Sequence, residues 1–162
     1  MRKINAGELS KILKEHKRWL DTDKKEGKRA DLYKADLSDA KLSDANLNYA
    51  DLYKADLSEA DLSNADLSEA DLIGADLSRA NLSGTNLSDA KLRKANLSLA
   101  DLSGANLRGA DLRRVIDLNI EFLSDVKTLY EAKLDPELKK QVRKKYPHLL
   151  EEPVEEEEED EE

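Results

Sequence analysis

The sequence predicts an all-β solenoid, a short backbone coil stacked repeatedly along the chain, with an α-helical cap at each end. A five-residue unit recurs seventeen times from Ala30 to Arg114, always with Leu in third place and with Ala first in all units but one. A longer period of twenty residues lies on this repeat, and amphipathic segments that lack it stand on either side. Unbroken periodicity of this kind determines the architecture before residue propensities are considered.

A period of five fits neither a helix nor a strand. Leucines five apart advance by about 500° on an α-helix, so they spiral around it without forming a stripe. On a strand they alternate between the two faces. The pattern fits a backbone that turns at each unit, with Leu and the small Ala directed inward. We therefore expect Leu72, in a middle coil, to be buried and Ser68 to lie on the surface.

The longer period indicates four units per coil. The fourth residue of the unit is Ser in ten units, but never in the units that begin at Ala30, Ala50, Ala70, Ala90 and Ala110. Those five units carry Tyr33, Tyr53, Ile73, Arg93 and Arg113. Every fourth unit is therefore expected to stack on one side of the solenoid.

The unit, a small residue followed by Asp or Asn, Leu and two variable residues, resembles the pentapeptide-repeat family. The resemblance covers residues 30–114, which are 85 of the 162 residues. It implies a right-handed quadrilateral β-helix of about four coils, made of short strand-like segments joined by tight turns. Departures are mild: Thr85 replaces Ala, and Lys41 and Lys91 replace Asp or Asn.

Residues 1–29 are predicted to form an N-terminal capping helix and a link. Asn5 can cap a helix over 5–20, with Glu8 at the capping-box spacing. Apolar residues and His16 follow helical spacing on one face, and we interpret Trp19 as a core residue of this cap. Such a helix would cover the unpaired strand edges at the open end of the coil.

Residues 115–150 are predicted to form a degenerate last coil, with an inserted turn or short helix, and a C-terminal capping helix. Asp135 followed by Pro136 is a typical helix start. The helix is expected to stop before Pro147, at the other end of the solenoid. Residues 151–162 carry ten acidic residues and no basic one, and we expect a disordered acidic tail.

Composition narrows the function classes. Of the net charge of −9, the tail contributes −10, the repeats −5, residues 1–29 +5 and residues 115–150 +1. The chain has no cysteine, which is compatible with a reducing compartment. We find no signal peptide and no apolar run of membrane-spanning length. These features favour a cytoplasmic protein without a membrane partner, and the net charge disfavours direct nucleic-acid binding.

Catalysis has little support in the sequence, and we predict no cofactor. His16 and His148, the only two histidines, are expected at opposite ends of the solenoid. No phosphate-binding loop or metal-ligand spacing occurs. Stacked Asp31, Asp51 and Asp71 could attract a cation loosely, but calcium needs six to eight converging oxygens. We expect these aspartates to form hydrogen bonds near turns, and we predict no metal site.

The twenty-residue period provides the candidate interaction site. Tyr and Arg are frequent anchors of protein interfaces. The side that begins with Ala30 combines apolar, aromatic and basic residues on an otherwise Ser-rich rod. We call the following residues the candidate face: Tyr33, Lys34, Tyr53, Lys54, Ile73, Arg93, Lys94, Arg113 and Arg114. It either binds a protein partner or is covered by a terminal segment.

The predicted function is a non-catalytic rigid scaffold for an unidentified protein partner, with the oligomeric state left open. The alternative comes from the resemblance, because some pentapeptide-repeat proteins mimic duplex DNA and bind type II topoisomerases such as gyrase. Stacked coils rise by about 4.8 Å each, so four coils give roughly 20 Å, or about six base pairs. An enzyme is a distant third possibility.

Overall fold

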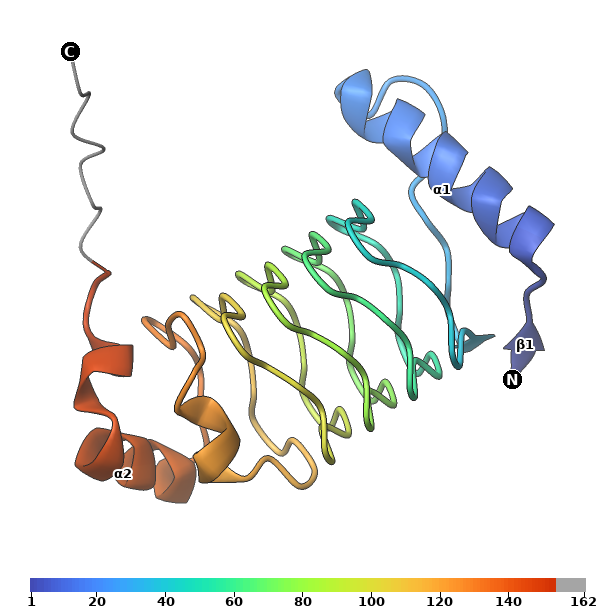
Figure 1. Ribbon diagram of the computed structural model, residues 1–162. Helices are drawn as coiled ribbons and strands as arrows, with labels where there is room; N and C mark the ends of the chain where they lie inside the picture. Colours follow the sequence, from blue (N-terminus) through green and yellow to red (C-terminus); the bar gives the residue numbers. More distant parts are fainter. Residues whose placement is uncertain (154–162) are drawn as a thin grey trace, which may run out of the picture.

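A computed structural model describes residues 1–153, and the part of the predicted acidic tail at 154–162 lies outside the described residues. The chain forms a stack of coils with helix α1 (Ala6–Asp21) at one end and helix α2 (Pro136–Lys145) at the other (Figure 1). Two 3-10 helices, η1 (Ile120–Leu123) and η2 (Pro147–Leu150), lie in the C-terminal part. The strands β1 (Arg2–Lys3) and β2 (Ala35–Asp36) are two residues long.

Four units complete one coil. From Asp31 to Asn96, parallel bridges join the second residue of each unit to the residue twenty positions later, as in Asp31 to Asp51 and Asp51 to Asp71. In each contact, Leu donates its N–H to the next coil, as in Leu32 to the Asp51 carbonyl at 2.8 Å. The repeat is thus a β-helix solenoid, as the twenty-residue period predicts.

The expectation of strand-like segments needs one correction. Between the coils the contacts are single-residue bridges, and the named strands are the short β1 and β2 pair. The reason is the turn at the end of each unit, where the first residue of the next unit donates to the central Leu, as in Ala35 N–H to the Leu32 carbonyl at 3.0 Å. The fifth residue has positive φ in all seventeen units, as at the third position of a type II turn.

Asp and Asn in the second position stabilise these turns. In every unit that has one of them, its side-chain oxygen accepts the N–H of the fourth residue, as Asp61 does from Ser63 at 3.1 Å. Many Ser hydroxyls bond to the same oxygen, including Ser63 at 2.7 Å. The expectation that the aspartates are hydrogen-bonded near turns is confirmed.

The interior is a column of Leu and Ala. All seventeen central leucines are buried, including Leu72 at 0% exposure. Thr85 occupies the Ala position without exposure, and its hydroxyl donates to the Leu62 carbonyl at 2.8 Å. The prediction that Ser68 lies on the surface is wrong, because the Asn48 amide one coil below donates to its hydroxyl at 2.9 Å and covers it.

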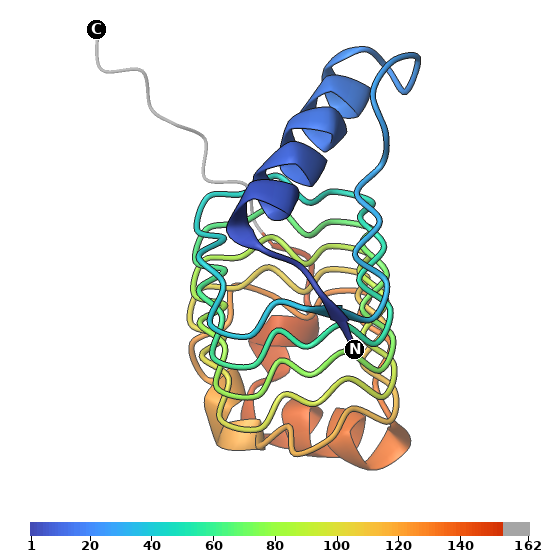
Figure 2. The same ribbon diagram turned by 90° about the vertical axis from the view of Figure 1, so that its right-hand side faces the viewer.

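The N-terminal segment lies on the first coil. β1 pairs in parallel with β2, with Arg2 opposite Ala35, and α1 runs across the open end and extends past its edge (Figure 2). Asn5 caps α1 through the Glu8 N–H at 2.9 Å, as predicted. The link then returns against α1, where Gly27 has φ +77° and an added Cβ would lie 2.3 Å from the Glu15 carbonyl oxygen.

The C-terminal segment continues the stack before it leaves the repeat. Ile116, Thr128 and Lys133 bridge to the coil below, and η1 is inserted between the first two of them. Leu129 then donates to the Leu149 carbonyl of η2 at 2.8 Å. Asp135 precedes α2 as predicted, but its side chain makes no cap bond and instead accepts the Arg114 N–H at 2.7 Å.

Candidate functional site

The candidate face is formed by the units that begin at Ala30, Ala50, Ala70, Ala90 and Ala110. Bridges between their second residues hold these units in register, so the fourth and fifth residues form two adjacent columns. At the N-terminal end, the rings of Tyr33 and Tyr53 stack with centroids 5.6 Å apart and planes 5° from parallel. The structure thus brings the two predicted tyrosines together on the outside of the coil.

Lysines of the fifth-residue column lie against these rings. The Lys34 ammonium is 4.9 Å from the Tyr33 centroid, and the Lys54 ammonium is 5.3 Å from the Tyr53 centroid. A hydrogen bond with the Tyr33 hydroxyl raises the pKa of Lys34. The next coil has Gly74, where an added Cβ would be 3.3 Å from Lys54 Cγ, so the Lys54 stem covers this position.

The C-terminal half of the candidate face is basic. Arg113 forms a two-point contact with Asp111, at 2.8 Å from Nε and 2.6 Å from Nη2, and this contact lowers the pKa of Asp111. Arg93 lies one coil below and is half-buried, and its Nε has no hydrogen-bond partner among the described residues. Lys94 and Arg114 are exposed beside them.

Residues 1–153 leave the two ends of the candidate face open. Tyr33 is 43% exposed, and Arg113 and Arg114 are exposed at the other end. Tyr53 and Ile73 are half-buried in the middle of the column. Helices α1 and α2 lie at the two ends of the solenoid (Figure 1).

A small acidic groove runs along the edge of the same side. It has a volume of about 230 Å³, and its carboxylates come from two neighbouring columns. The Tyr49 hydroxyl hydrogen-bonds to Glu69, which raises the pKa of Tyr49. The lining consists of Arg29, Tyr49, Asp51, Glu69, Asp71, Asp89 and Lys91.

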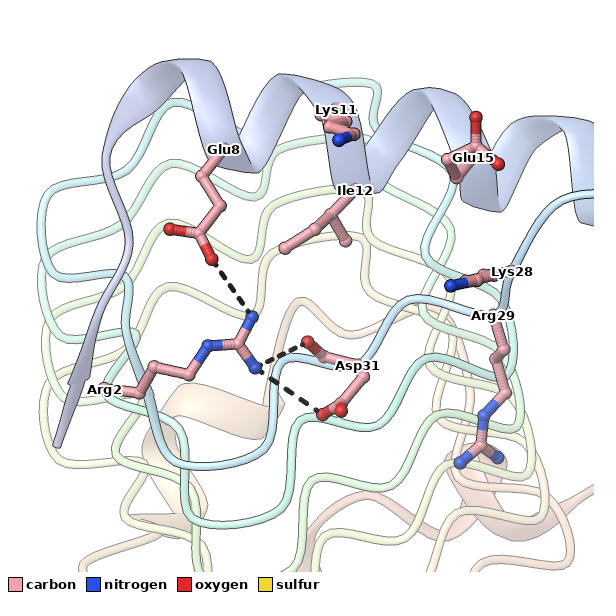
Figure 3. A pocket seen from close by; sticks show the side chains of 8 residues that line it. All are labelled: Arg2, Glu8, Lys11, Ile12, Glu15, Lys28, Arg29 and Asp31. Carbon is pink, nitrogen blue, oxygen red and sulfur yellow. Dashed lines mark hydrogen bonds and ion pairs between the residues drawn. The ribbon is translucent and has the colours of Figure 1, made fainter.

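A larger groove of about 430 Å³ lies between α1 and the first coil (Figure 3). The Arg2 guanidinium lies between the Glu8 carboxylate at 3.4 Å and the Asp31 carbonyl at 3.2 Å. Ile12 of α1 lies in the middle, with Lys28 and Arg29 on the far side. The charges of this groove are mixed and partly paired, so it offers no binding surface of a single sign. Its contacts connect the N-terminus to the first coil.

His16 is the buried polar centre of the N-terminal segment. It is 0% exposed, its Nδ1 accepts the Ala30 N–H at 3.1 Å, and its ring stacks on Trp19 at 5.7 Å. Burial lowers the pKa of His16. Trp19 is half-buried, with its ring edge-on to Tyr49 and the Lys24 ammonium 5.4 Å from it. It is therefore a contact between α1 and the coil wall instead of an interior residue.

Sequence reasoning missed this cluster of His16, Trp19, Tyr49 and Lys24, because Tyr49 is one variable residue among many in the fifth position.

Within residues 1–153, no group of three or more His, Asp or Glu side chains is arranged to hold a metal ion. No helix of this part of the chain has the length and hydropathy that crossing a membrane requires.

Comparison with known proteins shows what the chain is similar to. The family model for pentapeptide repeats matches residues 28–64, 60–98 and 80–116. No curated protein matches the sequence.

Solved structures provide the second comparison. A pentapeptide repeat protein from the cyanobacterium Cyanothece 51142 is 38% identical over 70% of this chain and 65% of its own, with a TM-score of 0.35. The chain thus spans less than two thirds of that protein. A pentapeptide repeat protein from Nostoc PCC 7120 is 33% identical over 75% of this chain and 93% of its own, with a TM-score of 0.35.

A plasmid-mediated fluoroquinolone resistance protein, QnrB1, is 21% identical over 75% of this chain and 74% of its own, with a TM-score of 0.38.

The family model covers more than half of the chain, in the segment whose coils and turns are described above. The chain therefore belongs to the pentapeptide-repeat family.

Proposed function

We propose that the chain is a non-catalytic scaffold, a right-handed quadrilateral β-helix capped by α1 and α2, that binds a protein partner through the candidate face. One observation carries the proposal. The stacked pair of Tyr33 and Tyr53 stands on the outside of the coil, beside Lys34 and Lys54, and residues 1–153 leave Tyr33 exposed.

The column of Tyr33, Tyr53 and Ile73 exceeds what the fold requires. Ser occupies the fourth position in ten units and forms the same turn. Two tyrosines and an isoleucine in that position add apolar area to a surface without strengthening the interior. Aromatic side chains contribute strongly to binding when a partner buries them. A protein surface with complementary apolar groups and carboxylates fits this arrangement.

The test replaces Tyr33, Tyr53 and Ile73 by Ser in the full chain. The matched control changes Ser58, Ser78 and Ser98, which hold the fourth position on the next side of the coil, to Ala. Partners captured from the source cell by the wild type should be lost from the triple Ser variant and kept by the control, with both variants still folded by circular dichroism. Capture that is unchanged in the triple Ser variant would overturn the proposal.

A second candidate is a DNA-mimicking modulator of a type II topoisomerase. The observation that favours it is the acidic groove, where Asp51, Glu69, Asp71 and Asp89 follow one another along the stack. The basic half of the candidate face weakens the resemblance to a uniformly negative duplex. A gyrase supercoiling assay distinguishes the two functions, because inhibition that is lost on changing Glu69 and Asp89 to Lys would favour mimicry.

A further inference from the structure

The C-terminal half of the candidate face continues onto the last coil as one basic surface. Lys133 bridges to Asp111 and so stands directly above the unit that carries Arg113 and Arg114. Lys91 is the second residue of the unit below. We call this surface the basic end: Lys91, Arg93, Lys94, Arg113, Arg114 and Lys133.

Most of these cations have no anionic partner. Arg113 is paired with Asp111 at 2.6 Å. None of the other five forms an ion pair with any residue in 1–153. Asp135 approaches Arg114 but accepts the backbone N–H and not the guanidinium. The basic end therefore has unmatched positive charge, and almost all of the chain's excess negative charge lies in residues 151–162, which contribute −10 to the net charge of −9.

The chain leaves the last coil beside this surface. Leu150 and Glu151 line the same groove, of about 670 Å³, as Lys133, Lys139 and Arg143. The hydrogen bond from Leu129 to Leu149 fixes η2 against the coil, so the point of exit is well defined. The acidic residues that follow thus start from a groove that also contains Lys133 of the basic end.

The C-terminal acidic segment matches the basic end in both length and charge. The residues from 152 to 162 can extend over roughly 35 Å, at about 3.3 Å each. From Lys133 to Arg93 is two coils, or about 10 Å, so the segment can cover the basic end. Residues 151–162 carry ten carboxylates and no cation. Carboxylates bound to Arg or Lys form the shorter and stronger class of hydrogen bonds.

We propose that the acidic C-terminal segment of the same chain docks on the basic end and so competes with any acidic partner for this half of the candidate face. The contact is electrostatic and exposed, so it should weaken with salt: the Debye length falls from about 30 Å at 0.01 M to about 3 Å at 1 M. The docking of the segment does not depend on the partner proposed above, because the experiment that detects it uses the free protein.

The experiment uses the absence of cysteine from the chain. A nitroxide is attached to Glu162→Cys in the otherwise full-length protein, and paramagnetic loss of amide signals is measured by NMR. Signals of residues 91–94, 111–114 and 133 should be lost at low salt, and those of the opposite side, such as 61–64 and 101–104, should be kept. The lost signals should return at high salt and when Gln replaces Glu at 155–159.

Matched variants test the receiving surface. Changing Lys94 and Arg114 to Glu should abolish the signal loss, whereas changing Lys34 and Lys54 to Glu, at the far end of the same column, should leave it. Glu fits these fifth positions, since Glu59 and Glu69 have φ of 60° and 56° there. Both double variants are thus expected to fold, and circular dichroism checks this.

Three results would overturn the proposal. The signal loss could be uniform, it could fall on another side of the coil, or it could persist after the change of Lys94 and Arg114. A mixture of two proteins tests whether the segment docks on a second copy of the chain. One protein carries the nitroxide and no ¹⁵N, and the other is enriched in ¹⁵N and carries no nitroxide. Loss at the basic end of the ¹⁵N molecules would mean that the segment docks on a second copy.

Discussion

The repeat units and the terminal segments are stabilised in different ways. In residues 30–114, each turn, Asx hydrogen bond and inter-coil bridge recurs many times with the same geometry. At the ends each contact occurs once, such as Ala30 to His16 or Arg114 to Asp135. The energy of the repeats is therefore distributed over many similar contacts, as nearest-neighbour descriptions of repeat proteins assume. Each end depends on a few individual side chains.

The largest expected effect is in the interior of the repeats. Leu72→Ala removes a fully buried side chain from a middle coil and should cost about 2–5 kcal/mol of unfolding free energy. Ser43→Ala is the control, because Ser43 is exposed and its unit has Lys41 in place of Asp. Denaturant unfolding measures both variants. Equal stability of the two would contradict the assignment of the Leu column as the core.

The second effect is at the N-terminal end. His16→Ala leaves the Ala30 N–H without its acceptor and opens space under α1, so about 1–3 kcal/mol should be lost from the hydrogen bond alone. Trp19 is the only tryptophan and stacks on this ring, so its fluorescence reports the local change. If Trp19 emission and the unfolding midpoint both stay at wild-type values, His16 does not anchor the N-terminal segment.

Acid should weaken the same contact, the hydrogen bond between the Ala30 N–H and His16. Since the pKa of His16 is lowered in the folded state, the unfolded chain binds the proton more readily. The stabilisation that neutral His16 gives the folded state is complete above the ordinary His pKa of about 6.5. It is lost as the pH falls below 6.5 toward the lowered pKa of His16 in the folded state. Protonation of Nδ1 also removes the acceptor for Ala30.

The measurement is Trp19 emission and thermal unfolding between about pH 7 and pH 5, the range in which an ordinary His titrates. The wild type should lose stability over this range, and His16→Ala should not show the same His-dependent step. A step of equal size in the variant would assign it to other groups.

The same contrast explains what the sequence could predict. The Leu column, the hydrogen-bonded aspartates and the twenty-residue stacking each recur, so their period identifies them without coordinates. The Asn5 cap and the helix start at Asp135 follow local rules of a few residues.

Single contacts between distant segments have no such pattern. The pairing of β1 with β2, the bond between His16 and Ala30, and the covering of Ser68 by Asn48 each depend on how two separate segments meet. The stacking of Tyr33 on Tyr53 could be predicted from the period, whereas the Trp19, Tyr49 and Lys24 contacts could not, because they join α1 to one particular turn.

The smallest effect concerns the Asx bonds, which occur many times and are individually dispensable. Asp61 accepts from the Ser63 N–H, the Ser63 hydroxyl and the Asn81 amide, at 3.1, 2.7 and 3.2 Å. The unit with Lys41 nevertheless forms the same turn without this side chain, with Ala45 N–H donating to the Leu42 carbonyl at 3.1 Å.

Asp61→Ala should therefore lower the melting temperature by less than His16→Ala does, and Lys41→Asn, which supplies the missing acceptor, should raise it slightly. Because the bond to Ser63 lowers the pKa of Asp61, its contribution is present above the ordinary Asp pKa and fades as acid protonates the carboxylate. The difference between wild type and Asp61→Ala should thus shrink at low pH. A loss as large as that of Leu72→Ala would mean that the turns, and not the Leu column, limit the stability of the repeats.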